Sequence, residues 1–127
     1  VMRVARVIVA SQSRSPYPPE RVGIYGRGAH STPAAARTEG LVAAYLLARD
    51  FGRREDLSLV RSAVELGVGF QLKTQLLPEQ AMYAENPPRA LGAFHQSLTD
   101  YEVRIDYVQH NLSGILGLRG VLLEASD

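Results

Sequence analysis

The segment Pro18–Tyr25, PPERVGIY, recurs loosely as Pro87–Phe94, PPRALGAF. Further along, Arg37–Leu41 (RTEGL) aligns with Arg104–Val108 (RIDYV) after a two-residue adjustment. Each copy follows an apolar stretch that ends in glutamine and leads into another apolar stretch of helical pattern. The spacing of about 67–69 residues is longer than common solenoid periods, but it suits two helices and a long loop. The recurrence therefore predicts a repeated helical hairpin.

Composition narrows the classes of protein. The chain of 127 residues has a formal net charge of +1, and its arginines are scattered rather than interleaved with aromatic residues. This distribution gives no electrostatic basis for binding nucleic acid or an anionic membrane. The absence of cysteine excludes disulfides, thiolate metal sites and a cysteine nucleophile. It is compatible with a cytoplasmic location and does not exclude secretion. No uninterrupted apolar stretch of ~18 residues is present, so no membrane span is expected.

Both ends of the chain have a helical pattern. The chain opens on the apolar segment Val1–Ala10 and closes on Gly120–Asp127. We therefore expect residues 1–127 to form a single helical domain or a fragment of a longer protein. Lys73 is the only lysine, and this preference for arginine suggests a GC-rich bacterial source.

The apolar periodicity predicts four helices, at about 1–12, 33–51, 55–76 and 102–124. The intervening loops are rich in proline and glycine, which interrupt helices. In the first segment the β-branched residues make a strand the alternative, and only the recurrence favours a helix. Ser31 or Thr32 is expected to cap the second helix.

The predicted helices differ in polarity. The second has no charged residue between Gly40 and Ala48, which predicts burial on all sides. The third carries one polar stripe, which predicts a side that faces water. This alternation fits two concentric rings of helices. In the last helix Gly114, Gly117 and Gly120 predict close packing against a neighbour.

Three segments resemble the α/α-toroid proteins. They are RTEGLVAAY at Arg37–Tyr45, NPPRALGAF at Asn86–Phe94 and RIDYVQH at Arg104–His110. The resemblance is to the six-hairpin glycosidase-like group, with its sugar epimerases and polysaccharide lyases, and to the terpene-cyclase and prenyltransferase toroids. The chain departs from the group at Ala93, where a second glycine is frequent, and at two aromatic positions, where tyrosine and phenylalanine replace tryptophan.

The resemblance implies an all-α fold, a partial toroid of about two hairpins with long loops before the inner helices. It also implies that these loops surround a cavity in which a saccharide binds, and that a longer chain supplies the remaining hairpins or domains.

Arg37 and Arg104 stand at the first turns of their predicted helices, where a cation opposes the helix dipole. Either they hold a carboxylate or phosphate of a ligand, as arginine does with two hydrogen bonds, or they link neighbouring helices, for example Arg37 to Asp106.

Glu39, Asp106 and His110 are the candidates for catalysis. Glu39 and Asp106 form either a carboxylate pair for acid–base chemistry or partners in salt bridges. Asp106 and His110 are four residues apart and share a helix face, so the carboxylate can orient the imidazole as a general base, or the histidine packs structurally. Tyr107 lies on the neighbouring stripe as a ligand contact. His110 and Asp106 supply at most two metal ligands and the spacing places no third, so neither a metal nor another cofactor is expected.

The long loops carry the remaining candidates, His30, His95 and Tyr25. Loop residues on a rigid scaffold often bind ligands, and aromatic rings stack on sugars. The alternative is that these side chains pack the loops onto the helices. Gly23–Gly28 has the wrong glycine spacing for a nucleotide-binding loop, and no predicted strand precedes it.

Three functions follow as hypotheses. The first is a toroid sector that acts on a carbohydrate or similar polar ligand, as a glycosidase, lyase or epimerase does. The second is a helical-repeat module for interaction or structure, without catalysis. The third is a fragment of a terpene-cyclase-like toroid, although the aspartate-rich acid motif of that class is missing from the chain.

Overall fold

The computed structural model describes residues 1–52 and 54–126 of the chain. Within them the elements are helices joined by loops, with isolated bridges and no strands. The all-α prediction is confirmed, and the first segment is a helix, not a strand. The elements are α1 (Met2–Ala10), η1 (Pro19–Arg21), α2 (Ser31–Phe51), α3 (Arg54–Leu72), α4 (Pro78–Ala81), α5 (Pro87–Ala90) and α6 (Ile105–Ala125).

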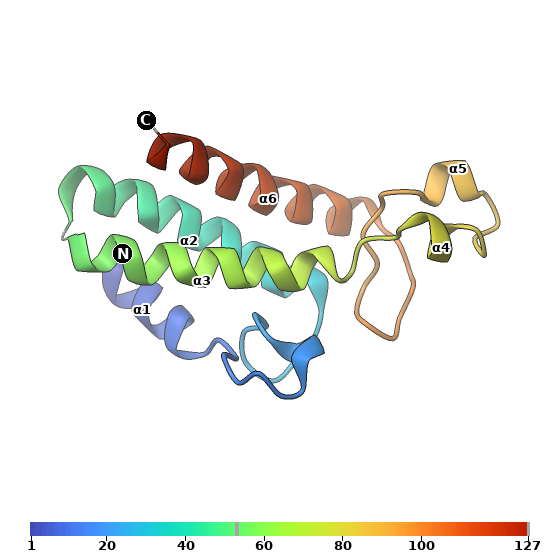
Figure 1. Ribbon diagram of the computed structural model, residues 1–127, viewed down its shortest axis with the longest axis horizontal. Coiled ribbons are helices and arrows are strands. Elements are labelled where there is room, and N and C mark those ends of the chain that lie inside the picture. Colours follow the sequence, from blue (N-terminus) through green and yellow to red (C-terminus); the bar gives the residue numbers. More distant parts are fainter. Residues whose placement is uncertain (53, 127) are drawn as a thin grey trace.

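The three long helices lie side by side, and α1 packs beneath them (Figure 1). Helices α2 and α6 run in the same direction, while α1 and α3 run in the opposite one (Figure 1). Side-chain contacts link α2 to α6 at two levels, between Glu39 and His110 and between Arg49 and Glu124. The loops that precede α2 and α6 meet at a bridge between His30 and Ser97. Each half of the chain is therefore one helix, a long loop and an antiparallel return helix.

The two halves share one turn. Gln12 pairs with Tyr25 in a bridge, and Gln75 pairs with Phe94 in the same way. The side-chain amides of these glutamines donate to a glycine carbonyl in each copy, over 3.3 Å to Gly23 and 3.2 Å to Gly92. Both glycines have positive φ, at 94° and 81°, which a residue with a side chain rarely adopts. The predicted repeat is confirmed at the level of hydrogen bonds.

Backbone hydrogen bonds repeat as well. Ser13 accepts from Gly23 N–H over 2.9 Å, and Leu76 accepts from Gly92 N–H over the same distance. The amides of Ser13 and Leu76 in turn donate over 2.8 Å to the residue after each glycine. These pairs close the loop where it leaves the first helix of each half.

Helix α3 forms the centre of the core. Its Val60, Val64 and Phe70 are fully buried, and Leu41 of α2 is buried beside them. Burial of each such side chain stabilises the fold by about 1.5–3 kcal/mol. The opposite side of α3 is solvated, as predicted, and there Arg61 pairs with Glu65 over 2.9 Å.

Helix α2 is buried on one side only, so the prediction that it is buried all round is wrong. Ala43 is exposed, and Leu46 and Leu47 keep 37% and 38% of their surface accessible. The neighbours α1, α3 and α6 pack on the opposite side of the helix. An uncharged sequence shows that a surface is apolar, but not that the same chain covers it.

Close helix packing is confirmed at two of the three predicted glycines. A Cβ at Gly114 would lie 3.0 Å from Nε2 of Gln71, and one at Gly117 would lie 2.9 Å from Cγ2 of Val42. At Gly120 the space is open within 4 Å, so the third prediction is wrong. The predicted cap of α2 is also wrong: the helix already includes Ser31, and no side-chain cap is formed at its start.

Candidate functional site

His110 and Glu39 meet across the two parallel helices. Imidazole Nδ1 lies 2.9 Å from Glu39 Oε2, and the two side chains are 35% and 28% exposed. Both groups are thus reachable from solvent while their contact is partly shielded. The expected partner of His110 was Asp106, one turn earlier on the same helix. That expectation is corrected, because the contact to Nδ1 comes from the neighbouring helix.

Asp106 pairs instead with Arg104, whose Nε lies 3.1 Å from Asp106 Oδ1. The Arg104 guanidinium also lies 5.2 Å from the centroid of the Tyr107 ring. The negative charge of Asp106 is the main reason that the pKa of Arg104 is raised. The suggested link from Arg37 to Asp106 does not form, since Arg37 donates over 3.4 Å to Pro33 O within its own helix. Both arginines remain on the surface.

Tyr107 joins the start of α6 to the second loop. Its hydroxyl lies 2.7 Å from Oε1 of Gln96 and 3.2 Å from Oε2 of Glu102. Burial of the side chain raises the pKa of Tyr107, and the hydrogen bond to Glu102 adds to this. Tyr107 is also one wall of a hollow of about 290 Å³ at the start of α2. The hollow is lined by His30, Thr32, Pro33, Gln96 and Tyr107.

Tyr25 and His95 are buried, and they pack the loops. The Tyr25 hydroxyl donates over 3.2 Å to Ala63 O of α3, and burial raises the pKa of Tyr25. The His95 side chain is 1% exposed, and its ring stacks on Tyr101 with 4.6 Å between centroids. Both residues take the packing role that the sequence left open, since their side chains are buried under the loops.

Sequence reasoning missed Gln96, Glu102 and a buried polar contact beneath the site. Gln71 of α3 donates to Asn111 O over 3.3 Å, and Asn111 Nδ2 donates to Tyr107 O over 2.7 Å. These polar residues come from the second loop, α3 and α6, and no fixed spacing relates them. The one available signal for the buried polar contact was that a glutamine, Gln71, stands among the apolar residues on the buried side of α3.

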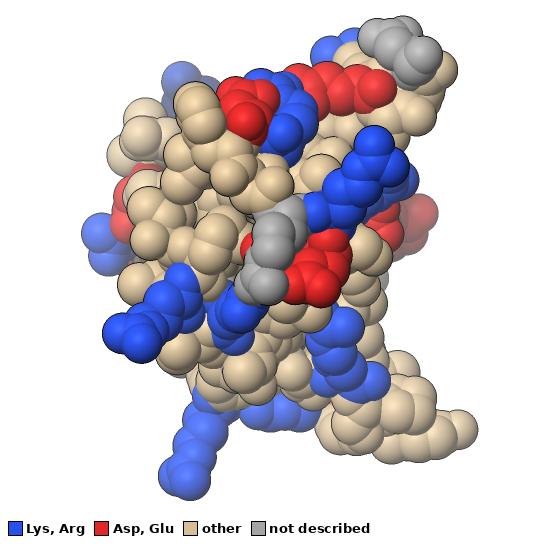
Figure 2. All heavy atoms as spheres, turned by 90° about the vertical axis from the view of Figure 1, so that its left-hand side faces the viewer, with Lys and Arg blue, Asp and Glu red and all other residues tan. Residues whose placement is uncertain are grey.

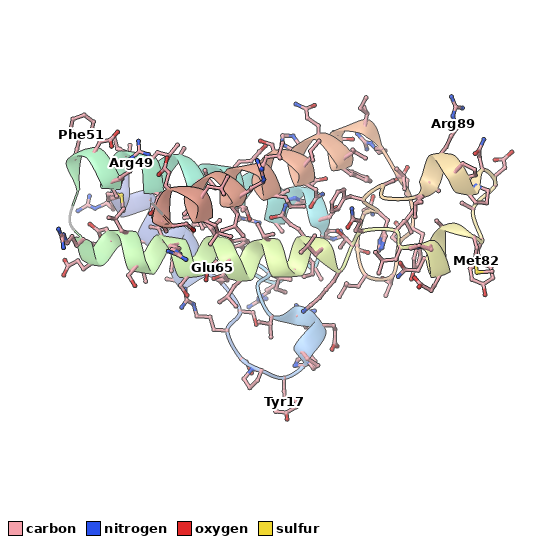
Figure 3. The ribbon with its side chains drawn as sticks, turned by 45° about the horizontal axis from the view of Figure 1, so that its top comes forward. Tyr17, Arg49, Phe51, Glu65, Met82 and Arg89 are labelled. Atoms are coloured by element: carbon pink, nitrogen blue, oxygen red, sulfur yellow. The ribbon has the colours of Figure 1, made fainter. Side chains whose placement is uncertain are left out.

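A broader groove of about 930 Å³ lies at the other end of α2 and α3. Arg49 and Phe51 mark this end, while Met82 and Arg89 mark the opposite one (Figure 3). On the end of the molecule that carries Arg49 and Phe51, positive and negative side chains are interspersed, without a patch of one sign (Figure 2). Three charged side chains of the groove form ion pairs: Arg61 with Glu65 at 2.9 Å, and Arg49 with the nearby Asp50 at 2.8 Å, which lowers the pKa of that carboxyl. The size of this groove therefore does not make it the better candidate site.

Comparison of the chain with family models, curated proteins and solved structures found no match. Among residues 1–52 and 54–126, no group of three His, Asp or Glu side chains is placed to hold a metal ion. In the same part of the chain, no helix combines the length and apolarity needed to cross a bilayer.

Proposed function

We propose that the chain is a sector of an α/α-toroid protein that binds an acidic carbohydrate between the N-terminal halves of α2 and α6. The observation that carries this proposal is the contact between His110 and Glu39 across two parallel inner helices. The repeated turn and the alternating helix directions also support the toroid, since they place both loops beside the start of an inner helix.

The chemistry suits proton abstraction. When the Nδ1–H group of His110 donates a hydrogen bond to Glu39, Nε2 carries the lone pair and acts as the base. Glu39 then orients the ring and stabilises the imidazolium that forms, in the manner of the carboxylate of a catalytic triad. The exposed guanidinium groups of Arg37 and Arg104 provide positive charge for a ligand carboxylate. A proton next to such a carboxylate is the one that a uronate lyase or epimerase removes.

Hydrolysis by two carboxylates is less well supported. That mechanism needs one carboxyl group as acid and a second as base or nucleophile, placed on either side of the scissile bond. Here Glu39 is paired with His110, and Asp106 is paired with Arg104. We therefore favour the lyase or epimerase class over the glycosidase class.

A non-catalytic interaction module is the second candidate. The exposed apolar surface of α2 and α6 favours it, because a helical repeat uses such surface to bind a partner. A terpene-cyclase-like fragment is less compatible with an ionisable pair between the inner helices, since its reaction requires an apolar cavity.

The test uses oligosaccharides that contain glucuronate or galacturonate, with neutral oligosaccharides of equal length as reference. We expect the protein to bind or convert only the acidic set. His110→Ala should reduce turnover by about 10²–10⁴-fold, as the loss of a general base does. Gln109→Ala, at an exposed neighbouring position, is the control and should leave turnover and melting unchanged. Equal behaviour of both variants, or no interaction with any acidic sugar, would reject the site.

A further inference from the structure

Helix α6 has an apolar face that nothing in the described chain covers. Ile105, Leu112, Leu116 and Leu123 are 87%, 48%, 53% and 52% exposed. Their spacing of seven, four and seven residues places them on one face of the helix. The buried residues Tyr107 and Gly114 lie on the opposite face, toward α2 and α3.

The internal repeat shows what covers such a face. Alignment of Arg37–Leu41 with Arg104–Val108 pairs Thr38 with Ile105 and Tyr45 with Leu112. In α2 these positions are buried, with Thr38 at 0% and Tyr45 at 9% exposure. Helix α3 lies against them: a Cβ at Gly67 would come within 2.7 Å of Thr38 Oγ1. The corresponding cover for α6 is therefore an antiparallel helix that resembles α3.

Helix α1 carries the matching face. The shared turn aligns Gln12 with Gln75, and therefore Val1 with Val64 and Val4 with Gly67. Val64 and Gly67 belong to the buried side of α3. Val1 and Val4, however, are 75% and 62% exposed, and Val7 beside them is 66% exposed. The positions by which α3 packs on α2 thus correspond to exposed apolar side chains on α1, although Val4 is bulkier than the Gly67 that it matches.

We propose that a second copy of this chain docks head to tail, with its α1 on the exposed face of α6. The contact places α1 of one chain on α6 of the next in the position that α3 takes on α2, with the larger pair Val4 and Ile105 where Gly67 meets Thr38. Such an interface is heterologous, because two different surfaces meet, and it leaves one free copy of each surface on the dimer. The proposal rests on the same repeat that supports the toroid but not on the chemistry of His110, so sedimentation and sugar binding test the two proposals separately.

The first experiment is sedimentation of the chain over a wide concentration range. We expect a mass above that of one chain, rising with concentration. The double variant Leu112→Glu, Leu116→Glu and the double variant Val4→Glu, Val7→Glu should each remain monomeric where the parent chain associates. All four positions are exposed, so helix content by circular dichroism should stay unchanged. Leu72→Glu, at a 48% exposed position of α3 away from both faces, is the matched control and should associate like the parent.

A mixing experiment separates head-to-tail docking from other arrangements. Each double variant retains one intact face, so an equimolar mixture of the two should form dimers and nothing larger. Symmetric pairing through α6 alone would instead let the Val4→Glu, Val7→Glu variant dimerise by itself. That result, or a parent chain that stays monomeric at every concentration, would overturn the proposal. A monomeric parent would mean that a different protein segment covers α6.

Discussion

Glu39 and His110 connect the two parallel helices α2 and α6, with Oε2 2.9 Å from Nδ1. Because both side chains are partly exposed, water screens their interaction. A double-mutant cycle of Glu39→Ala and His110→Ala in urea unfolding should give a coupling free energy of about 0.5–1 kcal/mol. The pair Arg61 and Glu65, within one helix, serves as the reference. Zero coupling would contradict a stabilising contact between the two side chains.

Two glycines in helices should respond in opposite ways to alanine. At Gly67 a Cβ would lie 2.5 Å from the Tyr25 hydroxyl, so Gly67→Ala should lower the free energy of unfolding by about 1–3 kcal/mol. At Gly120 the space is open and exposed, so Gly120→Ala should raise it by about 0.5–1 kcal/mol. Urea titration of both variants checks the sign. Similar effects of the two changes would contradict this packing of α3 on the first loop.

The two glutamines of the repeated turn should differ in their importance. Gln12 is buried and donates both to Gly23 O and, over 2.8 Å, to Ala63 O of α3. Gln75 is less buried, and its amide donates to Gly92 O. Gln12→Ala should therefore cost about 1–2 kcal/mol of unfolding free energy, and Gln75→Ala about 0.5 kcal/mol. Thermal melts that rank the two variants in the reverse order would disprove the assignment.

Tyr25 should make stability fall at high pH. Burial raises the pKa of Tyr25 above its ordinary value of 10.0 in the folded state. Below that value both states keep the phenol proton, and the contribution to stability is complete. As the pH rises past it, the unfolded chain loses the proton first, so the free energy of unfolding decreases until the folded pKa is passed.

Tyr25→Phe removes this dependence. The advantage of the parent chain over the variant in urea unfolding should shrink as the pH rises above about 9. Tyr17 is 81% exposed at the tip of the first loop, so Tyr17→Phe is the control and should change nothing (Figure 3). A constant difference between the parent and Tyr25→Phe would contradict the burial of the hydroxyl.

The long helices could be predicted because their signals are local. The expected segment 33–51 corresponds to Ser31–Phe51, and 102–124 corresponds to Ile105–Ala125. The short helices α4 and α5 lie in a segment for which the sequence predicts a loop. Each has only four residues and begins with proline, so it shows no apolar periodicity. The repeat was readable from Gly23 and Gly92, because a positive φ restricts the residue type in both copies.

The partners within the candidate site were harder to predict. Asp106 and Glu39 were both available to His110, and sequence spacing favoured the one on the same helix. The outcome depends on the register between α2 and α6, which is set by the fit of Gly114 and Gly117 against their neighbours. Such a fit between distant segments has no local signature. For the same reason, the sequence did not tell whether α2 was covered on all sides.

In the second copy of the turn, the residues just before α4 are hydrogen-bonded to residues just after α5. Gln75 and Leu76 are already bonded to Gly92 and Ala93, so residues 77–91 form an appendage whose ends are tied together. It extends beyond the long helices, with Met82 at its far end (Figure 3). Insertions or deletions in this appendage would leave the helix packing undisturbed. Residues 77–91 can therefore change in length and sequence while the packing of the long helices stays the same.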